Sequence, residues 1–164
     1  MKRTITFLFA AVLIVGAVPM FAQSASTNLG VTATVNANCT IATAPVAFGA
    51  YDSLGVTDLA GTGTVSVTCT KGSGVRIDLD LGSHFTGTTR RMAGGGDFLT
   101  YELYKEVAHT NIWGSGAVNG NLLGARGALD PKTRTYTVYG NIAGGQDVAA
   151  AAAYTDTVKA TIIF

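Results

Sequence analysis

Short segments in which apolar and polar residues alternate run through most of the chain. The first, over residues 29–39, places apolar residues on one face and glycine, threonine or asparagine on the other. A period of two residues sustained over this length is typical of a β-strand with one buried face. Further strands are predicted at residues 62–70, 75–81, 98–104, 133–142 and 155–164, with a short one at 46–48.

Glycine-rich turns, for example at residues 72–74 and 94–97, separate these segments. The alanine run at residues 149–153 has helix propensity but little more than one turn of length, so a loop of small residues is an equally good interpretation. No internal repeat or domain boundary interrupts the series of strands. Six or seven short strands punctuated by turns predict one all-β domain, a β-sandwich with immunoglobulin-like character.

The first residues have the layout of a secretory signal peptide. Lys2 and Arg3 form a basic start, residues 5–18 are almost wholly apolar, and small residues follow Pro19. We expect a signal peptide over residues 1–22, cleaved after Ala22 or within the next three residues. An uncleaved membrane anchor is the alternative, but the apolar run is shorter than the roughly 20 residues of a membrane span.

Export would place Cys39 and Cys69 in an oxidising compartment, where two cysteines most simply form one disulfide. Both cysteines continue the apolar face of their alternating segments, in keeping with a buried bridge. Closing a loop of about 30 residues stabilises a domain by roughly 3–4 kcal/mol in the chain-entropy model. The spacing of the two cysteines excludes a CxxC redox motif.

Composition narrows the possible functions. Charged residues make up 13% of the 164 residues, and the formal net charge is +1. Soluble proteins contain roughly 25% charged residues, so the surface of this chain is sparsely charged. Nucleic acid is not an expected partner, because nucleic-acid-binding proteins usually carry a basic surface. Disorder is excluded as well, since hydrophobic residues make up 48% of the chain.

The polar residues form no recognisable catalytic motif. His84 and His109 lie in predicted loops without the spacing of metal ligands, and no serine lies in a G-x-S-x-G motif. Four residues are best interpreted as facing solvent: Asp78 and Asp80 on one strand, and Arg90 and Arg91 in a turn. Four aromatic residues could line a sugar site but more often belong to a core: Tyr101, Tyr104, Trp113 and Tyr136. We expect neither enzymatic activity nor a cofactor or metal.

The two ends of the predicted sandwich suggest an incomplete domain. The last predicted strand runs to Phe164 without a polar tail, and the alternating segment at residues 29–39 is apolar on one face. If the N-terminal segment is not needed in its own domain, it can add as a strand to another subunit. Burying its apolar residues would contribute about 5–10 kcal/mol. These residues are Leu29, Val31, Ala33 and Val35.

An ordered set of short motifs resembles the spore coat protein U-like domain family, whose members supply the subunits of archaic chaperone–usher pili. The matching motifs lie at residues 35–41, 48–52, 63–70, 91–92, 99–104, 113–114, 137–142, 145–146 and 154–158. Each motif alone is weak, but their order along nearly the whole exported chain is specific. One departure is the alanine run at 149–153, where the family tends to have a Pro-Ala-Gly-like turn.

The resemblance implies an immunoglobulin-like sandwich over residues 37–164 that lacks its last strand. A periplasmic chaperone would lend a strand to the open groove. An outer-membrane usher would then exchange it for the donor segment, residues 23–36, of an identical or related pilin subunit. The implied donor anchors are Leu29, Val31, Ala33 and Val35, and the implied groove-edge residues are Val158, Ala160, Ile162 and Phe164.

The product implied by the resemblance is a pilus on the cell surface that serves attachment and biofilm formation. Such a subunit would pass through the periplasm and touch the membrane only through the usher. Two alternatives remain open: a structural protein of a spore coat, and a secreted glycan-binding β-sandwich.

Overall fold

The computed structural model describes residues 21–114, 123–124 and 130–164. The chain divides into two units, Met1–Thr34 and Val35–Phe164. The described part of the first unit, residues 21–34, contains no strand, and its side chains are exposed. The predicted signal peptide falls almost entirely on residues 1–20, which lie outside the described residues. None of the described segments forms a helix long and apolar enough to cross a membrane.

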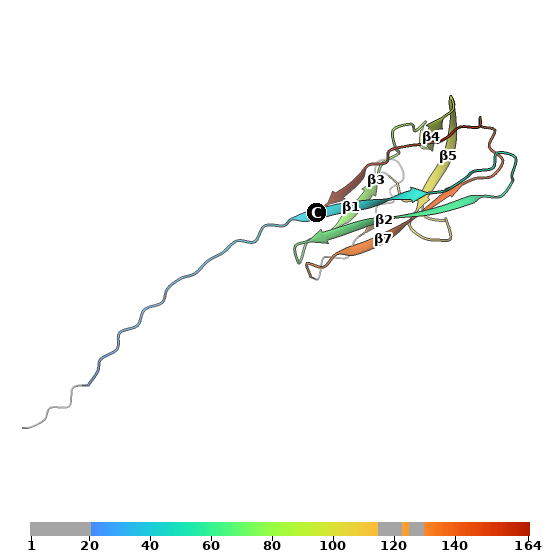
Figure 1. The fold of residues 1–164 in the computed structure, drawn as a ribbon. Helices are drawn as coiled ribbons and strands as arrows, with labels where there is room; N and C mark the ends of the chain where they lie inside the picture. Colours follow the sequence, from blue (N-terminus) through green and yellow to red (C-terminus); the bar gives the residue numbers. More distant parts are fainter. Residues whose placement is uncertain (1–20, 115–122, 125–129) are drawn as a thin grey trace, which may run out of the picture. The chain divides into compact units, whose positions relative to one another are not determined.

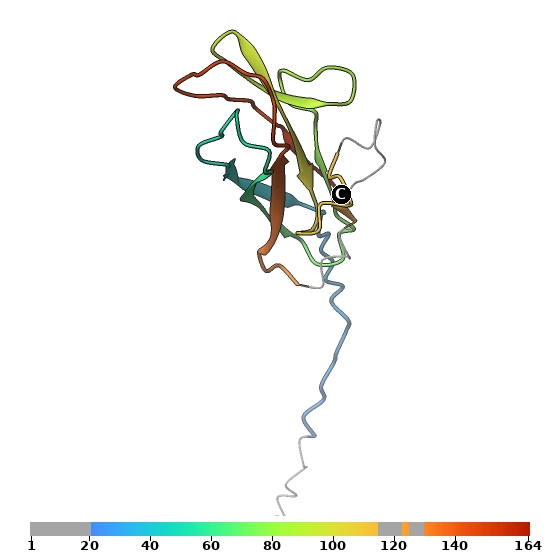
Figure 2. The ribbon, with the colours of Figure 1, turned by 90° about the vertical axis from the view of Figure 1, so that its right-hand side faces the viewer.

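The second unit is a sandwich of two antiparallel sheets (Figures 1 and 2). One sheet has the order β1-β2-β7-β5-β4, and the other has the order β6-β3-β8. The strands are β1 (Cys39–Ala47), β2 (Leu59–Cys69), β3 (Arg76–Leu79), β4 (Arg90–Gly94), β5 (Asp97–Tyr104), β6 (Leu123–Gly124), β7 (Arg134–Ile142) and β8 (Ala160–Ile163). The predicted all-β sandwich is therefore confirmed.

Four predicted strands correspond closely to β2, β3, β5 and β7, each of which has one buried face. The last strand, β8, is shorter than predicted, because regular pairing with β3 begins only at Ala160. β1 was predicted only at its two ends, by the segments 29–39 and 46–48, and two further strands were not predicted at all. β4 contains the pair Arg90 and Arg91, which we expected in a solvated turn, and β6 has two residues. The alanine run at residues 149–153 is a loop in the structure.

The alternation at residues 29–39 does not form a strand in the structure. Only Cys39 belongs to one, and β1 continues from there to Ala47. The strand prediction was therefore wrong for residues 29–38. An extended segment leaves its main-chain N–H and C=O groups without protein partners until another strand pairs with it. The described residues give this segment no such neighbour.

One hydrophobic core joins the two sheets. β2, β5 and β7 contribute residues from one sheet, and β3 contributes Ile77 and Leu79 from the other. The fully buried residues include Val65, Val67, Leu99, Leu103, Trp113, Val138 and Ile142. The indole N–H of Trp113 donates to Ile77 O at 3.0 Å, so the loop that follows β5 is tied to β3.

Arg90 is fully buried, which contradicts the expected solvated turn. Its guanidinium forms an ion pair with Glu102 and donates to three backbone carbonyls. These are Leu79 O at 2.9 Å, Asp80 O at 2.7 Å and Trp113 O at 2.9 Å. Because nearly all of its donors have partners, the cost of desolvating the charge is offset. Arg90 therefore links β4 to the end of β3 and to the loop at Trp113.

Candidate functional site: an open groove between β1 and the C-terminal segment

The outer edge of β1 carries main-chain groups that no strand pairs with among the described residues. Thr70 N–H donates to Asn38 O at 2.8 Å, whereas the Cα atoms of the next pair, Cys39 and Cys69, lie 4.1 Å apart. Hydrogen-bonded and non-hydrogen-bonded pairs alternate in an antiparallel ladder, and the second kind brings the Cα atoms closer. The N–H and C=O groups of Cys39, Ile41 and Thr43 therefore point away from β2.

The outer edge of β8 is open in the same way. Asp80 N–H donates to Lys159 O at 3.0 Å, so these two residues form a hydrogen-bonded pair. The alternation then directs the main-chain groups of Ala160 and Ile162 away from β3. Two strand edges thus have unused hydrogen-bonding groups, one in each sheet.

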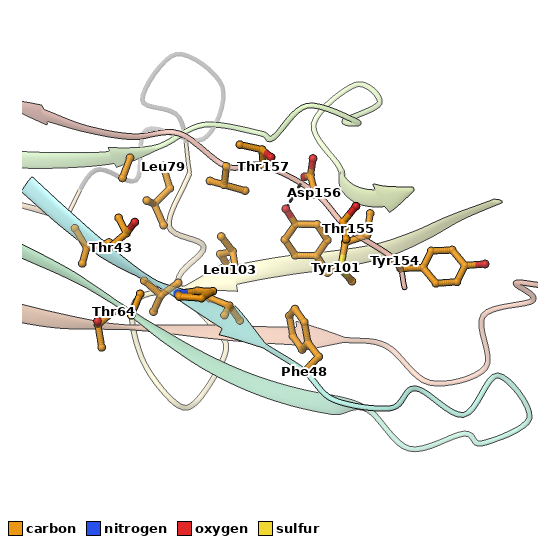
Figure 3. Close-up of a pocket in the computed structure, with 18 residues that line it drawn as sticks. Thr43, Phe48, Thr64, Leu79, Tyr101, Leu103, Tyr154, Thr155, Asp156 and Thr157 are labelled. Carbon is orange, nitrogen blue, oxygen red and sulfur yellow. Dashed lines mark hydrogen bonds between the residues drawn. The ribbon is translucent and has the colours of Figure 1, made fainter. Parts of the chain in front are cut away.

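A groove of about 390 Å³ lies between β1 and the C-terminal segment. Residues 43–46 and Phe48 form one wall, and residues 154–158 with Ala160 form the other. The floor consists of side chains from the core: Val65, Leu79, Met92, Tyr101, Leu103 and Val138. Figure 3 shows Tyr101 and Leu103 between the two walls. The groove therefore runs along core side chains of the sandwich, between β1 and the C-terminal segment.

A second hollow, of about 660 Å³, adjoins the first. It shares Val46, Phe48, Met92 and Tyr154 with the groove, and its far side is lined by residues 148–153. The alanine run at 149–153 thus forms a wall of small side chains. Tyr154 fixes this wall through a hydrogen bond from its hydroxyl to Ala149 O at 2.7 Å.

The expected disulfide is present and joins Cys39 of β1 to Cys69 of β2. The two cysteines are 30 residues apart in the sequence. The disulfide therefore closes a loop of the length for which the chain-entropy model gives a stabilisation of roughly 3–4 kcal/mol. Cys69 is buried and Cys39 is half-buried against the core. The bridge therefore fixes the first residue of the strand that forms one groove edge.

Asp156 is the main polar side chain of the groove. Its side chain is 3% exposed, and its carboxylate accepts the Tyr101 hydroxyl at 2.6 Å (Figure 3). Burial raises the pKa of Tyr101, and the hydrogen bond to Asp156 raises it further. Tyr101 therefore remains a neutral hydrogen-bond donor at any physiological pH, and it fixes the carboxylate at the edge of the groove floor.

The residues expected at the groove edge occupy different environments. Val158, Ala160 and Ile162 are half-buried and pack against the core, whereas Phe164 follows β8 and is 56% exposed. Of the four expected donor anchors, Leu29 and Val31 are 88% and 85% exposed. Ala33 and Val35 are exposed as well.

Two parts of the groove were not identified from the sequence. The wall at residues 43–46 lies in β1, where Ala44 and Pro45 interrupt any clear alternation. Asp156 lies on the apolar face of a predicted strand, in phase with Val158 and Ala160. A carboxylate on the buried face of a strand is unusual and indicates a buried polar cluster. Asp156 could have been identified from the sequence on this ground.

The described residues contain no group of three or more His, Cys, Asp or Glu side chains arranged to hold a metal ion. Two of the four aromatic residues that could line a sugar site are inaccessible. Trp113 and Tyr101 are buried, with exposed fractions of 0% and 7%, and the Tyr101 hydroxyl is already bonded to Asp156. A buried ring cannot stack on a sugar, so these residues belong to the core.

Three comparisons with known proteins bear on this fold. Protein U of Myxococcus xanthus is 36% identical over 181 aligned positions, which cover 99% of this chain and 98% of the relative. One solved structure is the CsuC–CsuE chaperone–tip adhesion subunit pre-assembly complex from the archaic chaperone–usher Csu pili of Acinetobacter baumannii. A chain of that complex matches with a TM-score of 0.57 and 22% identity, over 80% of this chain and 40% of its own length. The Spore Coat Protein U domain matches residues 25–161, and the chain belongs to that family.

Proposed function

We propose that this chain is an exported structural subunit of a surface pilus, assembled by donor-strand exchange. The observation that carries the proposal is the open groove, with a free strand edge on each side and core side chains on its floor. An inserted strand would pair with both edges and pack on the groove floor. Its own alternating side chains would fill the groove, and no enzymatic activity is needed for this role.

The donor in this proposal is residues 23–36 of a neighbouring copy or a related subunit. This segment offers Leu29, Val31, Ala33 and Val35 on one face, which is the spacing a strand needs to place successive side chains into one groove. Burying them would contribute about 5–10 kcal/mol. The same groove would first be occupied by a strand from a periplasmic chaperone, and an outer-membrane usher would catalyse the exchange.

Export is part of this proposal. The signal peptide over residues 1–22 would direct the chain to the periplasm, where the disulfide between Cys39 and Cys69 can form. The similarity in fold to a chain of a chaperone–subunit complex supports this route. Attachment and biofilm formation are the roles that we propose for the assembled fibre.

The proposal is tested by deleting residues 24–35 and expressing the chain with the chaperone and usher of its host. We expect the chaperone to bind the shortened subunit, since its groove is intact, and fibres to be absent from the cell surface. A matched pair separates the donor role from a general effect of the segment. Val31→Asp on the apolar face should abolish fibres, and Thr32→Asp on the polar face should not. Normal fibres from the deletion variant would contradict the proposal.

A structural protein of a spore coat is the second candidate. It is favoured by the 36% identity to Protein U over nearly the full length of both chains, and by the description of the family. Donor-strand assembly applies to either product, so the two differ in where the polymer is laid down. Antibody labelling of intact vegetative cells and of spores separates them, because a pilus is expected on vegetative cells.

A further inference from the structure

The C-terminal wall of the groove has little main-chain support before β8 begins. Thr155 and Ala93 of β4 exchange N–H···O bonds at 2.9 and 3.0 Å, and the next main-chain bond is the one from Asp80 N–H to Lys159 O at 3.0 Å. Residues 156–158 therefore lie between two points of main-chain attachment, and the Ser83 hydroxyl donates to Thr157 O at 3.3 Å between them. Without other contacts, this stretch of the wall would be free to move across the groove.

Asp156 supplies one such contact. Its Oδ1 accepts the backbone N–H groups of Ser83 at 2.8 Å and of His84 at 3.3 Å, and the His84 ring nitrogen Nδ1 lies 3.1 Å away. Its Oδ2 accepts the Tyr101 hydroxyl at 2.6 Å. One side chain thus connects the wall to the loop after β3 and to β5.

Asp80 connects the same two parts from the side of the loop after β3. It lies directly after β3, and its Oδ1 accepts Lys159 N–H at 2.8 Å and Gly82 N–H at 2.9 Å. Its own main chain is fixed, because the buried Arg90 guanidinium donates to Asp80 O. The loop therefore holds the wall through Asp80, while the wall holds the loop through Asp156.

The backbone of the loop is shaped to allow this arrangement. Gly82 has a φ of +82°, in the region that favours glycine. A Cβ atom at this position would overlap Asp156 Oδ2. The close approach of the loop to the carboxylate therefore needs a residue without a side chain.

We propose that Asp80 and Asp156 act together as positioning residues that hold residues 156–159 in place and keep the groove open for an incoming strand. We call this pair the aspartate clasp. The proposal rests on the proposed function and adds a device that acts before any donor arrives. A groove whose wall is held in place loses less conformational entropy on strand insertion, and so binds a donor more tightly.

The test measures binding of a labelled synthetic peptide of residues 23–36 to the full-length mature chain, together with hydrogen exchange of the unbound chain. Asp156→Ala and Asp80→Ala should each weaken peptide binding about tenfold or more, because each removes hydrogen bonds to a charged acceptor. Exchange should accelerate at residues 156–163 and stay unchanged in β2 and β7. Asp80→Asn should behave like the wild type, since an amide oxygen can replace Oδ1.

Asp147→Ala is the matched control, because Asp147 is an exposed carboxylate on the same C-terminal stretch. It should alter neither binding nor exchange. If Asp156→Ala does not fold, Tyr101→Phe removes only the hydroxyl donor and should give a smaller change in the same direction. A general loss of stability would instead accelerate exchange throughout both sheets, and that result would overturn the proposal.

The two proposals fail in different ways. If the wild-type chain binds the peptide and the two alanine variants bind it within twofold of the wild type, the clasp proposal is wrong and the pilus proposal stands. If the wild-type chain does not bind the peptide, the donor-strand proposal is wrong. In that case exchange alone decides whether the clasp holds the wall, and unchanged exchange at residues 156–163 rejects it.

Discussion

The segment at residues 29–38 and strand β2 have the same alternating pattern and different structures. In β2, Val65 and Val67 are 2% and 4% exposed and the strand pairs on both sides. In the N-terminal segment, Leu29 and Val31 are 88% and 85% exposed and no strand forms. Alternation therefore states which face a segment can bury, but not which chain supplies the partner.

The largest difference in stability between the two segments is expected when an apolar residue of each is replaced by aspartate. Val67→Asp buries a charge in the core without a partner, so it should destabilise the domain by more than about 4 kcal/mol. Val31→Asp should leave the melting temperature of the monomer unchanged. Thermal unfolding of the purified variants measures both. Equal destabilisation by the two substitutions would mean that residue 31 is buried within its own domain.

The disulfide joins Cys39, which directly follows the N-terminal segment, to Cys69 at the end of β2. Its loss should have the next largest effect on stability. Cys39→Ser and Cys69→Ser should each lower the free energy of unfolding by about 3–4 kcal/mol, and the yield of exported protein should fall. The double variant should lose no more than the single ones, because they remove the same bond. Denaturant unfolding under oxidising conditions provides the measurement, and an unchanged midpoint would show that the bridge contributes nothing.

Substitution by alanine tests the same difference between β2 and the N-terminal segment with a smaller change. Val65→Ala removes buried methyl groups and leaves a cavity, which should cost about 2–3 kcal/mol. Val31→Ala should change the stability of the monomer by less than about 0.5 kcal/mol. Its effect should appear in the assembled fibre, which should dissociate at a lower temperature than the wild-type fibre. A fibre as stable as the wild type would argue against Val31 as an anchor.

Lowering the pH should weaken hydrogen bonds in the sandwich and leave the N-terminal segment unchanged, because residues 21–36 contain no titratable side chain. Hydrogen bonds from the Asn141 amide and from Gly144 N–H hold the pKa of Asp58 below its usual value. A lowered folded-state pKa means that the stabilisation is present above the unfolded-state pKa. It is lost as the pH falls through the folded-state value.

The measurable consequence of this small effect is local. Protection of the Gly144 amide, that is its exchange rate relative to the intrinsic rate at each pH, should fall on acidification in the wild type and change less in Asp58→Asn, which keeps a polar side chain but does not titrate. Identical pH profiles for the two proteins would show that the Asp58 carboxylate does not hold this loop.

Much of the sandwich could be predicted because its central strands alternate cleanly. Each of β2, β3, β5 and β7 has one face in the core, so local pattern and tertiary burial agree. β1 could not be predicted with the same certainty, because Pro45 and a shift of register between Ala44 and Ala47 interrupt its pattern. β4 could not be predicted, because arginine is usually exposed and only the fold provides carbonyl acceptors and Glu102 for the charge of Arg90.

The groove, like the fold, could be predicted from the sequence only in part. The face of the C-terminal segment was predicted correctly as apolar at Val158, Ala160 and Ile162, which pack against the core. The opposite wall and the role of Asp156 depend on residues far apart in the sequence, such as Ser83 and Tyr101. No local pattern contains those pairings.

The sequence by itself determined the all-β class and the pairing of Cys39 with Cys69. These follow from periodicity and from the number of cysteines, which are local or countable properties. Only the tertiary structure decided that Arg90 is buried, that Asp156 secures a wall, and that a groove opens between β1 and the C-terminal segment. The physical reason is that burial and hydrogen-bond satisfaction depend on which segments the fold brings together, and alternation says nothing about that choice.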